Sequence, residues 1–168
     1  GIVIVLGTIL CTILEKSGAA IKMADTIVKA VGKKRPALAM SIIGYIVSIP
    51  VFCDSGFVIL NSLRKSLAKR TKTSSVTMTV ALATGLYATH TLVPPTPGPI
   101  AAAANLGIDN NLLLVILFGL FISIPAVAIG YFYAKWIGKR IQTSEDLDDA
   151  QESYDELLKK YGTLPNAW

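Results

Sequence analysis

Two basic clusters, at residues 33–35 and 64–72, enclose a long stretch without lysine or arginine. That stretch, residues 36–63, is apolar except at its centre, where residues 49–56 bring a proline, an aspartate, a serine and a glycine. Basic residues beside a membrane segment mark its cytoplasmic side, so we expect both ends of the stretch on one side. Irregular backbone at membrane depth is tolerated only where it packs in protein or lines a cavity. The pattern therefore predicts a re-entrant helical hairpin over residues 36–63, with its tip at a transport site.

The distribution of positive charge favours this topology over a single spanning helix. With a re-entrant hairpin, all 16 lysines and arginines lie on the cytoplasmic side or at its interface. If residues 36–63 crossed the membrane once, the cluster at 64–72 would face the other compartment, against the bias of basic residues toward the cytoplasm.

A second irregular segment interrupts the next apolar stretch. Residues 74–91 have the length and composition of a membrane helix and run into residues 94–99, which contain four prolines and one glycine. Proline lacks the amide hydrogen, and its ring clashes with the preceding turn, so the helix stops there. An alanine run at 101–104 resumes it. We predict a membrane helix over residues 74–105 that is broken by the prolines, followed by a loop on the outer side.

The remaining segments complete an all-α integral membrane unit over residues 1–140. Its further elements are a membrane helix at 1–14, an amphipathic interfacial helix at 17–31 capped by Ser17, and a membrane helix at 112–138. A polar cytoplasmic linker helix follows at 141–168. Because the chain opens inside an apolar helix, we expect an internal fragment of a longer transporter.

Composition removes several other classes of protein. Hydrophobic residues make up 52% of the chain, and its net charge of +5 comes from residues at the ends of apolar stretches, so we expect no nucleic-acid partner. Cys11 and Cys53 lie in apolar segments, as small hydrophobic residues do, and predict neither a disulfide nor a metal site. Motifs of the nucleophile elbow, Walker loop, zinc site and Rossmann fold are missing from the sequence, so we expect no enzyme and no cofactor.

Two titratable residues are candidates for chemistry. Asp54 is the one acid deep in an apolar segment, and His90 is the one histidine. Ionisable groups at membrane depth are costly and are functional candidates by default. Asp54 has three readings: cation binding, proton relay, or orientation of the tip through backbone amides. For His90, proton exchange and a structural hydrogen bond remain equally open.

The two irregular segments together predict a substrate site. Transporters with broken helices bind substrate near the bilayer midplane, where free amides of half-helix N-termini attract carboxylates. Hydroxyls, amides and one imidazole suit a small polyhydroxylated carboxylate. The candidate binding residues are Ser55, Gly56, Thr89, Thr91, Thr96 and Gly98.

The chain resembles the gluconate permease (gluconate:proton symporter) family of the ion-transporter superfamily. The matching stretches are residues 7–20, 49–57, 89–99 with the run THTLVPPTPGP, and 101–107. The likeness extends over residues 1–140, and the proline-rich motif is specific. The family often has a histidine where Thr96 stands, which weakens the case for a second titratable group there.

The resemblance implies a multi-pass transporter of the bacterial inner membrane that imports gluconate or a related sugar acid with protons. It also implies two inverted repeats, each with a re-entrant hairpin and a broken helix. This chain would carry most of the first, with the remaining half of the transporter as its partner, and we expect a homo-oligomer in the lipid bilayer. Two alternatives are a sodium-coupled carboxylate transporter and a membrane protein that binds ligand without transporting it. A membrane-embedded hydrolase using Asp54 and His90 is a more remote one.

Overall fold

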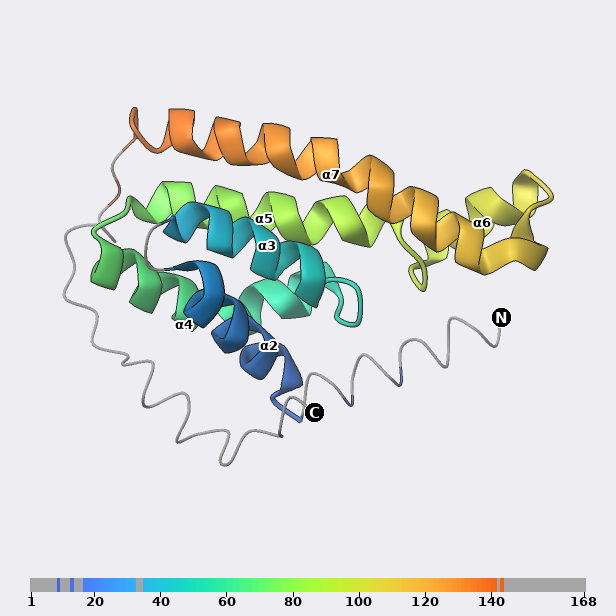
Figure 1. Ribbon diagram of the computed structural model, residues 1–168, viewed down its shortest axis with the longest axis horizontal. Helices are drawn as coiled ribbons and strands as arrows, with labels where there is room; N and C mark the ends of the chain where they lie inside the picture. Colours follow the sequence, from blue (N-terminus) through green and yellow to red (C-terminus); the bar gives the residue numbers. More distant parts are fainter. Residues whose placement is uncertain (1–8, 10–12, 14–16, 33–34, 142, 144–168) are drawn as a thin grey trace.

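The described part of the computed structural model consists of helices joined by short turns (Figure 1). It comprises residues 9, 13, 17–32, 35–141 and 143. The predicted membrane helix at 1–14 and the linker at 141–168 fall almost wholly outside these residues. The elements are α2 Ala19–Ile27, a π-helical turn Val28–Gly32, α3 Pro36–Val47, α4 Cys53–Thr71, α5 Ser75–Leu92, α6 Pro97–Asn105, a 3₁₀ turn Asp109–Asn111 and α7 Leu112–Ile137.

Helices α3 and α4 form a hairpin with an irregular turn at residues 48–52. Pro36 starts α3, as suits a residue without an amide hydrogen at a helix N-terminus. At 12 residues, α3 is about 18 Å long, well short of the roughly 30 Å of bilayer hydrocarbon. The open ends of both helices lie near the start of α5 and the end of α7 (left in Figure 1).

The sequence-based prediction of the hairpin tip was wrong in one respect. We expected irregular backbone through residue 56 and a return arm from residue 57, but α4 begins at Cys53. Asp54 therefore lies in the first turn of a helix, where a negative side chain interacts favourably with the helix dipole.

Helix α5 ends at the proline-rich segment, and α6 follows after a short turn over residues 93–96. Val93 and Thr96 have extended backbone angles, and Pro97 occupies the start of α6. Helix therefore resumes at Pro97, four residues earlier than the alanine run from which we expected it. Helix α6 lies at the end of the molecule opposite the open ends of the hairpin (right in Figure 1).

Small residues bring α7 close to α5, which it runs beside for much of its length (Figure 1). A Cβ atom on Gly119 would lie 2.2 Å from the Leu92 carbonyl oxygen, and one on Gly130 would lie 2.6 Å from the Cβ of Thr84. Because neither contact is possible for a larger residue, glycine sets the distance between these helices.

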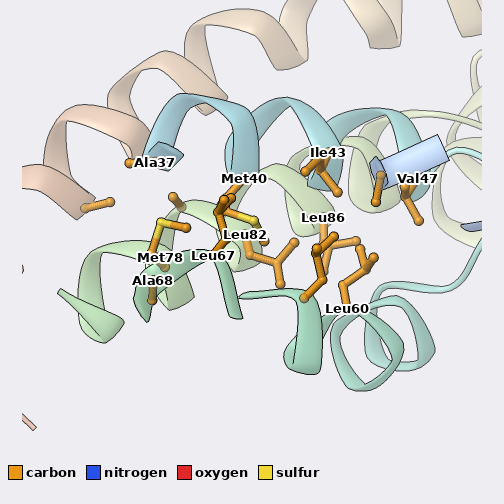
Figure 2. Packing of buried hydrophobic residues seen from close by; sticks show 14 of the residues in the cluster. Ala37, Met40, Ile43, Val47, Leu60, Leu67, Ala68, Met78, Leu82 and Leu86 are labelled. Atoms are coloured by element: carbon orange, nitrogen blue, oxygen red, sulfur yellow. The ribbon is translucent and has the colours of Figure 1, made fainter. Parts of the chain in front are cut away.

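The hydrophobic core lies between α3, α4 and α5 (Figure 2). Helices α3 and α5 also meet through their backbones: a Cβ on Gly44 would lie 2.6 Å from the Leu82 carbonyl oxygen, and one on Gly85 would lie 2.4 Å from the Ser41 carbonyl oxygen. Small residues of this kind are typical of helix packing in membranes. Fully buried core residues include Met40, Ile43, Leu60, Met78, Leu82 and Leu86.

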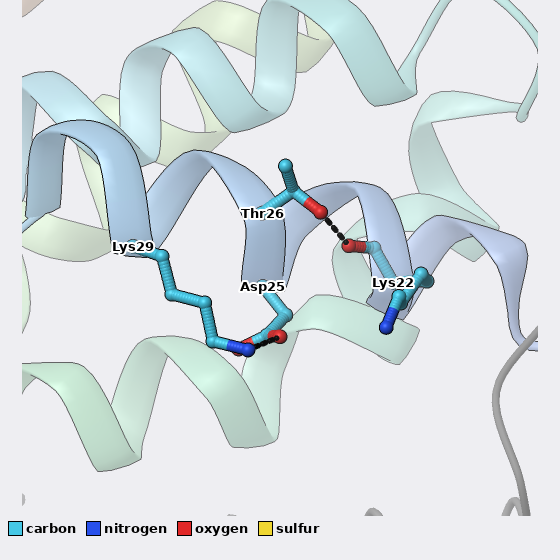
Figure 3. Close-up of polar contacts among 4 residues, drawn as sticks. All are labelled: Lys22, Asp25, Thr26 and Lys29. Carbon is cyan, nitrogen blue, oxygen red and sulfur yellow. Dashed lines mark hydrogen bonds and ion pairs between the residues drawn. The ribbon is translucent and has the colours of Figure 1, made fainter. Parts of the chain in front are cut away.

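Helix α2 packs its apolar face on protein, with Ile21 and Ala24 buried. Its N-cap is Gly18, with a positive φ of 73°, and not Ser17 as we expected. Asp25 is 8% exposed, and its Oδ2 atom forms an ion pair with the Nζ atom of Lys29 at 2.7 Å (Figure 3). The last turn of the expected helix has π geometry, over Val28–Gly32.

Two helical stretches of the described chain are long and apolar enough to cross a membrane, Ser75–Asn105 and Asp109–Ile137. The second exposes large apolar side chains along most of its length. At its C-terminal end, Arg140 lies 4.4 Å from the ring of Trp136, an arrangement of aromatic and basic residues that is common at a membrane interface. Both stretches thus have the features of helices that face lipid or other membrane segments.

Candidate functional site

The hairpin turn and the last two turns of α5 come together at one place, which we call the tip–α5 site. It comprises Phe52, Asp54, Ser55, Tyr87, His90 and Thr91. On α5, the last three of these share a helix face, because residues three and four apart are neighbours on a helix surface.

A hydrogen bond joins the first turn of α4 to α5. The Tyr87 hydroxyl donates to the Asp54 Oδ1 atom at 3.1 Å. The thiol of Cys53 lies 3.7 Å from the same oxygen, at the distance of a weak S–H···O interaction. Asp54 and Tyr87 are both exposed, so this bond lies at the open side of the molecule.

His90 contacts the turn through an aromatic pair. Its ring meets the ring of Phe52 edge to face, with centroids 5.9 Å apart. The Nδ1 atom of His90 is buried and has no hydrogen-bond partner in the described part of the chain. Buried polar nitrogens usually have a partner, so this atom is available to a proton, a water or a ligand.

The turn itself is fixed to α5 at a third point. The Ser48 hydroxyl is buried and donates to the Leu86 carbonyl oxygen at 2.7 Å. Gly56 packs on the same residue, since a Cβ there would lie 3.1 Å from the Leu86 side chain. The absence of a side chain at Gly56 thus lets α4 approach α5, a packing role beside the binding role predicted for it.

The predicted threonines divide into two kinds. Thr89 and Thr96 are buried, and their hydroxyls donate to carbonyl oxygens of nearby backbone, those of Gly85 and Val93. Thr91 is exposed, and its hydroxyl donates to the Tyr87 carbonyl oxygen at 2.8 Å. Of the three threonines, Thr91 is the one on the same face of α5 as Tyr87.

The proline-rich break lies beyond this site, toward α6 (Figure 1). Gly98 is exposed there, and no described atom lies within 4 Å of a Cβ placed on it. The structure therefore brings Asp54, Ser55 and Gly56 to the end of α5 that carries His90 and Thr91, and leaves Gly98 apart from them.

Sequence reasoning missed Tyr87, Phe52 and Ser48. Tyr87 was detectable, because it precedes His90 by three residues and Thr91 by four and so shares their helix face. Phe52 and Ser48 act through the shape of the turn, for which the sequence holds no local signal. Among the described residues, no group of three or more His, Cys, Asp or Glu side chains is placed to hold a metal ion.

Comparison with known protein families decides what kind of protein this is. The family model described as GntP family permease matches residues 1–168. The chain belongs to the GntP permease family. We therefore place it in the bacterial inner membrane, as a protein with helical transmembrane segments.

Three relatives illustrate the similarity of this GntP-family chain to known proteins. It is 45% identical to an uncharacterized permease of Haemophilus influenzae, over 95% of this chain and 34% of the relative. It is 40% identical to the inner membrane permease YgbN of Escherichia coli, over 83% of this chain and 30% of YgbN. A gluconate permease of Zymomonas mobilis is 39% identical, over 99% of this chain and 36% of the relative.

The chain thus spans about a third of the length of these curated relatives. No solved structure matches it. In the described part of the chain, the tip–α5 site is exposed on the side of Asp54, Tyr87 and Thr91.

Proposed function

We propose that the whole permease imports a small hydroxycarboxylate of the gluconate type together with protons, and that both the substrate and the proton bind at the tip–α5 site. The hydrogen bond between Tyr87 and Asp54 is the observation that carries the proposal, because it joins the hairpin to α5 just before the proline-rich break. Broken helices of transporters meet at their binding sites in this way.

The hairpin is re-entrant in this proposal. Its two open ends lie at the same end of the molecule as the basic C-terminal end of α7 (Figure 1), which carries Lys135, Lys139 and Arg140. Basic residues mark the cytoplasmic side, so the hairpin enters from the cytoplasm and its turn lies within the membrane. A second repeat of inverted topology, outside this chain, would supply the opposite half of the site.

The substrate class is supported by the relatives. One is a gluconate permease, and others are the D-serine transporter DsdX, 36% identical over 83% of this chain, and the Gnt-II system L-idonate transporter, 32% identical over 73% of this chain. Gluconate, D-serine and L-idonate all combine a carboxylate with at least one hydroxyl group. Ser55 and Thr91 offer hydroxyls at the open side of the site, and Gly56 and Thr89 shape the backbone beside it. Thr96 and Gly98 lie beyond the site, at the start of α6.

Asp54 and His90 are the residues we propose for proton coupling. An ionised Asp54 repels a substrate carboxylate, whereas a protonated Asp54 does not, so substrate and proton bind better together than separately. The buried Nδ1 atom of His90, one helical turn from Tyr87, offers a second place for the proton.

Reconstitution of the full-length protein in liposomes tests this proposal. We expect an inward proton gradient to drive accumulation of labelled gluconate, and a sodium gradient at fixed pH to have no effect. Accumulation that follows sodium and ignores protons would replace proton coupling by sodium coupling. Binding of labelled gluconate without exchange across the membrane would show a ligand-binding protein and refute transport.

A further inference from the structure

Tyr87 is held in a position that its own helix does not require. Its side chain is 49% exposed on α5, yet the hydroxyl reaches across to Asp54 on α4. Because half of the Tyr87 side chain stays exposed, the pairing buries little surface and contributes little to the stability of the fold.

The geometry around Asp54 is more specific than a simple tether. Both the Tyr87 hydroxyl and the Cys53 thiol approach one carboxylate oxygen, Oδ1. With Oδ1 engaged on the protein side, the second oxygen is the one left to face a proton or a substrate. The phenol thereby fixes how the carboxylate is turned toward the open side of the site.

We infer that Tyr87 is a positioning residue for proton coupling: it orients Asp54 and transmits the protonation of Asp54 to the contact between α4 and α5. This inference rests on the proposed function. A hydrogen bond to an ionised carboxylate is roughly twice as strong as one to a neutral group. Protonation of Asp54 therefore loosens the tie between the hairpin and α5 when a substrate arrives, and deprotonation restores it.

The test compares two rates in liposomes that contain the full-length protein. One is gluconate accumulation driven by a proton gradient; the other is gluconate exchange at equal concentrations and equal pH on both sides, which needs no net proton movement. For Tyr87→Phe we expect the gradient-driven rate to fall about tenfold, the loss of one hydrogen bond to a charged group, while exchange stays within about twofold of the wild type.

Two further variants separate positioning from a structural role. Tyr45→Phe removes another tyrosine hydrogen bond, from the hydroxyl of Tyr45 to the Leu120 carbonyl oxygen at 2.8 Å, and should leave the ratio of the two rates unchanged. In an Asp54→Asn background, Tyr87→Phe should have no further effect on the ratio, because its action passes through the carboxylate.

The outcomes distinguish a failure of the proposed function from a failure of the inference about Tyr87. A wild-type protein that is indifferent to the proton gradient refutes the proposed function, and the inference falls with it. If the proton gradient drives uptake by the wild type, and Tyr87→Phe leaves the ratio of accumulation to exchange unchanged, the inference about Tyr87 is refuted and the proposed function stands. Equal losses in both rates, or additive losses in the double variant, would show that Tyr87 is a structural contact and would also overturn it.

Discussion

Helix α5 has two neighbours within the hairpin, and it meets them in different ways. Toward α3 the contact is made by backbone: Gly44 and Gly85 leave no room for a side chain, and Ser48 bonds the turn to Leu86. Toward the first turn of α4 the contact combines the packing of Gly56 on Leu86 with one hydrogen bond between exposed side chains, from Tyr87 to Asp54. Close backbone packing has few alternative arrangements, whereas a single exposed hydrogen bond is easily remade.

The difference assigns separate tasks to the two arms of the hairpin. We expect the arm α3 and helix α5 to move as one unit, because their backbones are in contact. A hydrogen bond from the Tyr45 hydroxyl to the Leu120 carbonyl oxygen also joins α3 to α7. The start of α4 carries the acid and is the part whose attachment depends on charge. Changes at the α3–α5 contact should therefore reduce stability, and changes at the α4–α5 contact should alter transport.

The largest effect is expected from Gly85→Ala. The new Cβ would lie 2.4 Å from the Ser41 carbonyl oxygen, so the two helices have to separate. We expect a loss of about 3 kcal/mol in the free energy of unfolding, the upper range for overpacking. Thermal or denaturant unfolding of the purified full-length protein in detergent measures it.

Gly98→Ala is the matched control, because no described atom lies within 4 Å of a Cβ at that position. Its stability should stay within about 1 kcal/mol of the wild type, since alanine favours helix over glycine by roughly that amount. Equal losses in the two variants would contradict the close packing of α3 on α5.

Asp54→Asn should separate transport from stability. The side chain is exposed, so the midpoint of unfolding should barely move. Proton-driven gluconate uptake should fall at least about tenfold, as the removal of an acid–base group typically costs 10²–10⁴-fold where it acts directly. Asp109→Asn, in the exposed loop before α7, should leave uptake unchanged. Retained proton dependence in Asp54→Asn would remove Asp54 from the coupling mechanism.

Ser48→Ala should show a smaller effect of the structural kind. The variant leaves the Leu86 carbonyl oxygen without its 2.7 Å donor, and we expect a loss of about 1 kcal/mol in stability. Thr79→Ala, whose hydroxyl donates within its own helix to Ser75, serves as the comparison and should cost less. If Ser48→Ala instead abolished uptake at full stability, the turn would belong to the transport machinery.

The comparison also shows which parts of the structure could be predicted from the sequence. The broken helix and α7 were predictable, because prolines end helices and a long apolar stretch has few other structures. The start of α4 was not. Asp, Ser and Gly were interpreted as breakers, yet an acid suits the first turn of a helix, and the missing side chain of Gly56 serves packing on Leu86.

For a related reason, the sequence could not predict which threonines face the site. Thr89 and Thr91 are two residues apart, so they lie on different faces of α5, and the face that is buried depends on where Gly85 meets α3. That contact joins residues far apart in the chain, and no local pattern fixes it. The helix spacing of Tyr87, His90 and Thr91 was the local signal that did exist.

Substrate protection of a cysteine at position 91 tests the central claim, that substrate occupies the tip–α5 site. In full-length protein whose native cysteines, Cys11 and Cys53 among them, are replaced by alanine, the measurement is the labelling rate of Thr91→Cys by a small thiol reagent, with and without gluconate. At ten times the dissociation constant, we predict labelling about tenfold slower, because the free fraction falls in that proportion. Ala104→Cys, exposed on α6, should show no protection. If the variant still transports gluconate but gluconate does not slow the labelling of Thr91→Cys, substrate does not occupy the tip–α5 site.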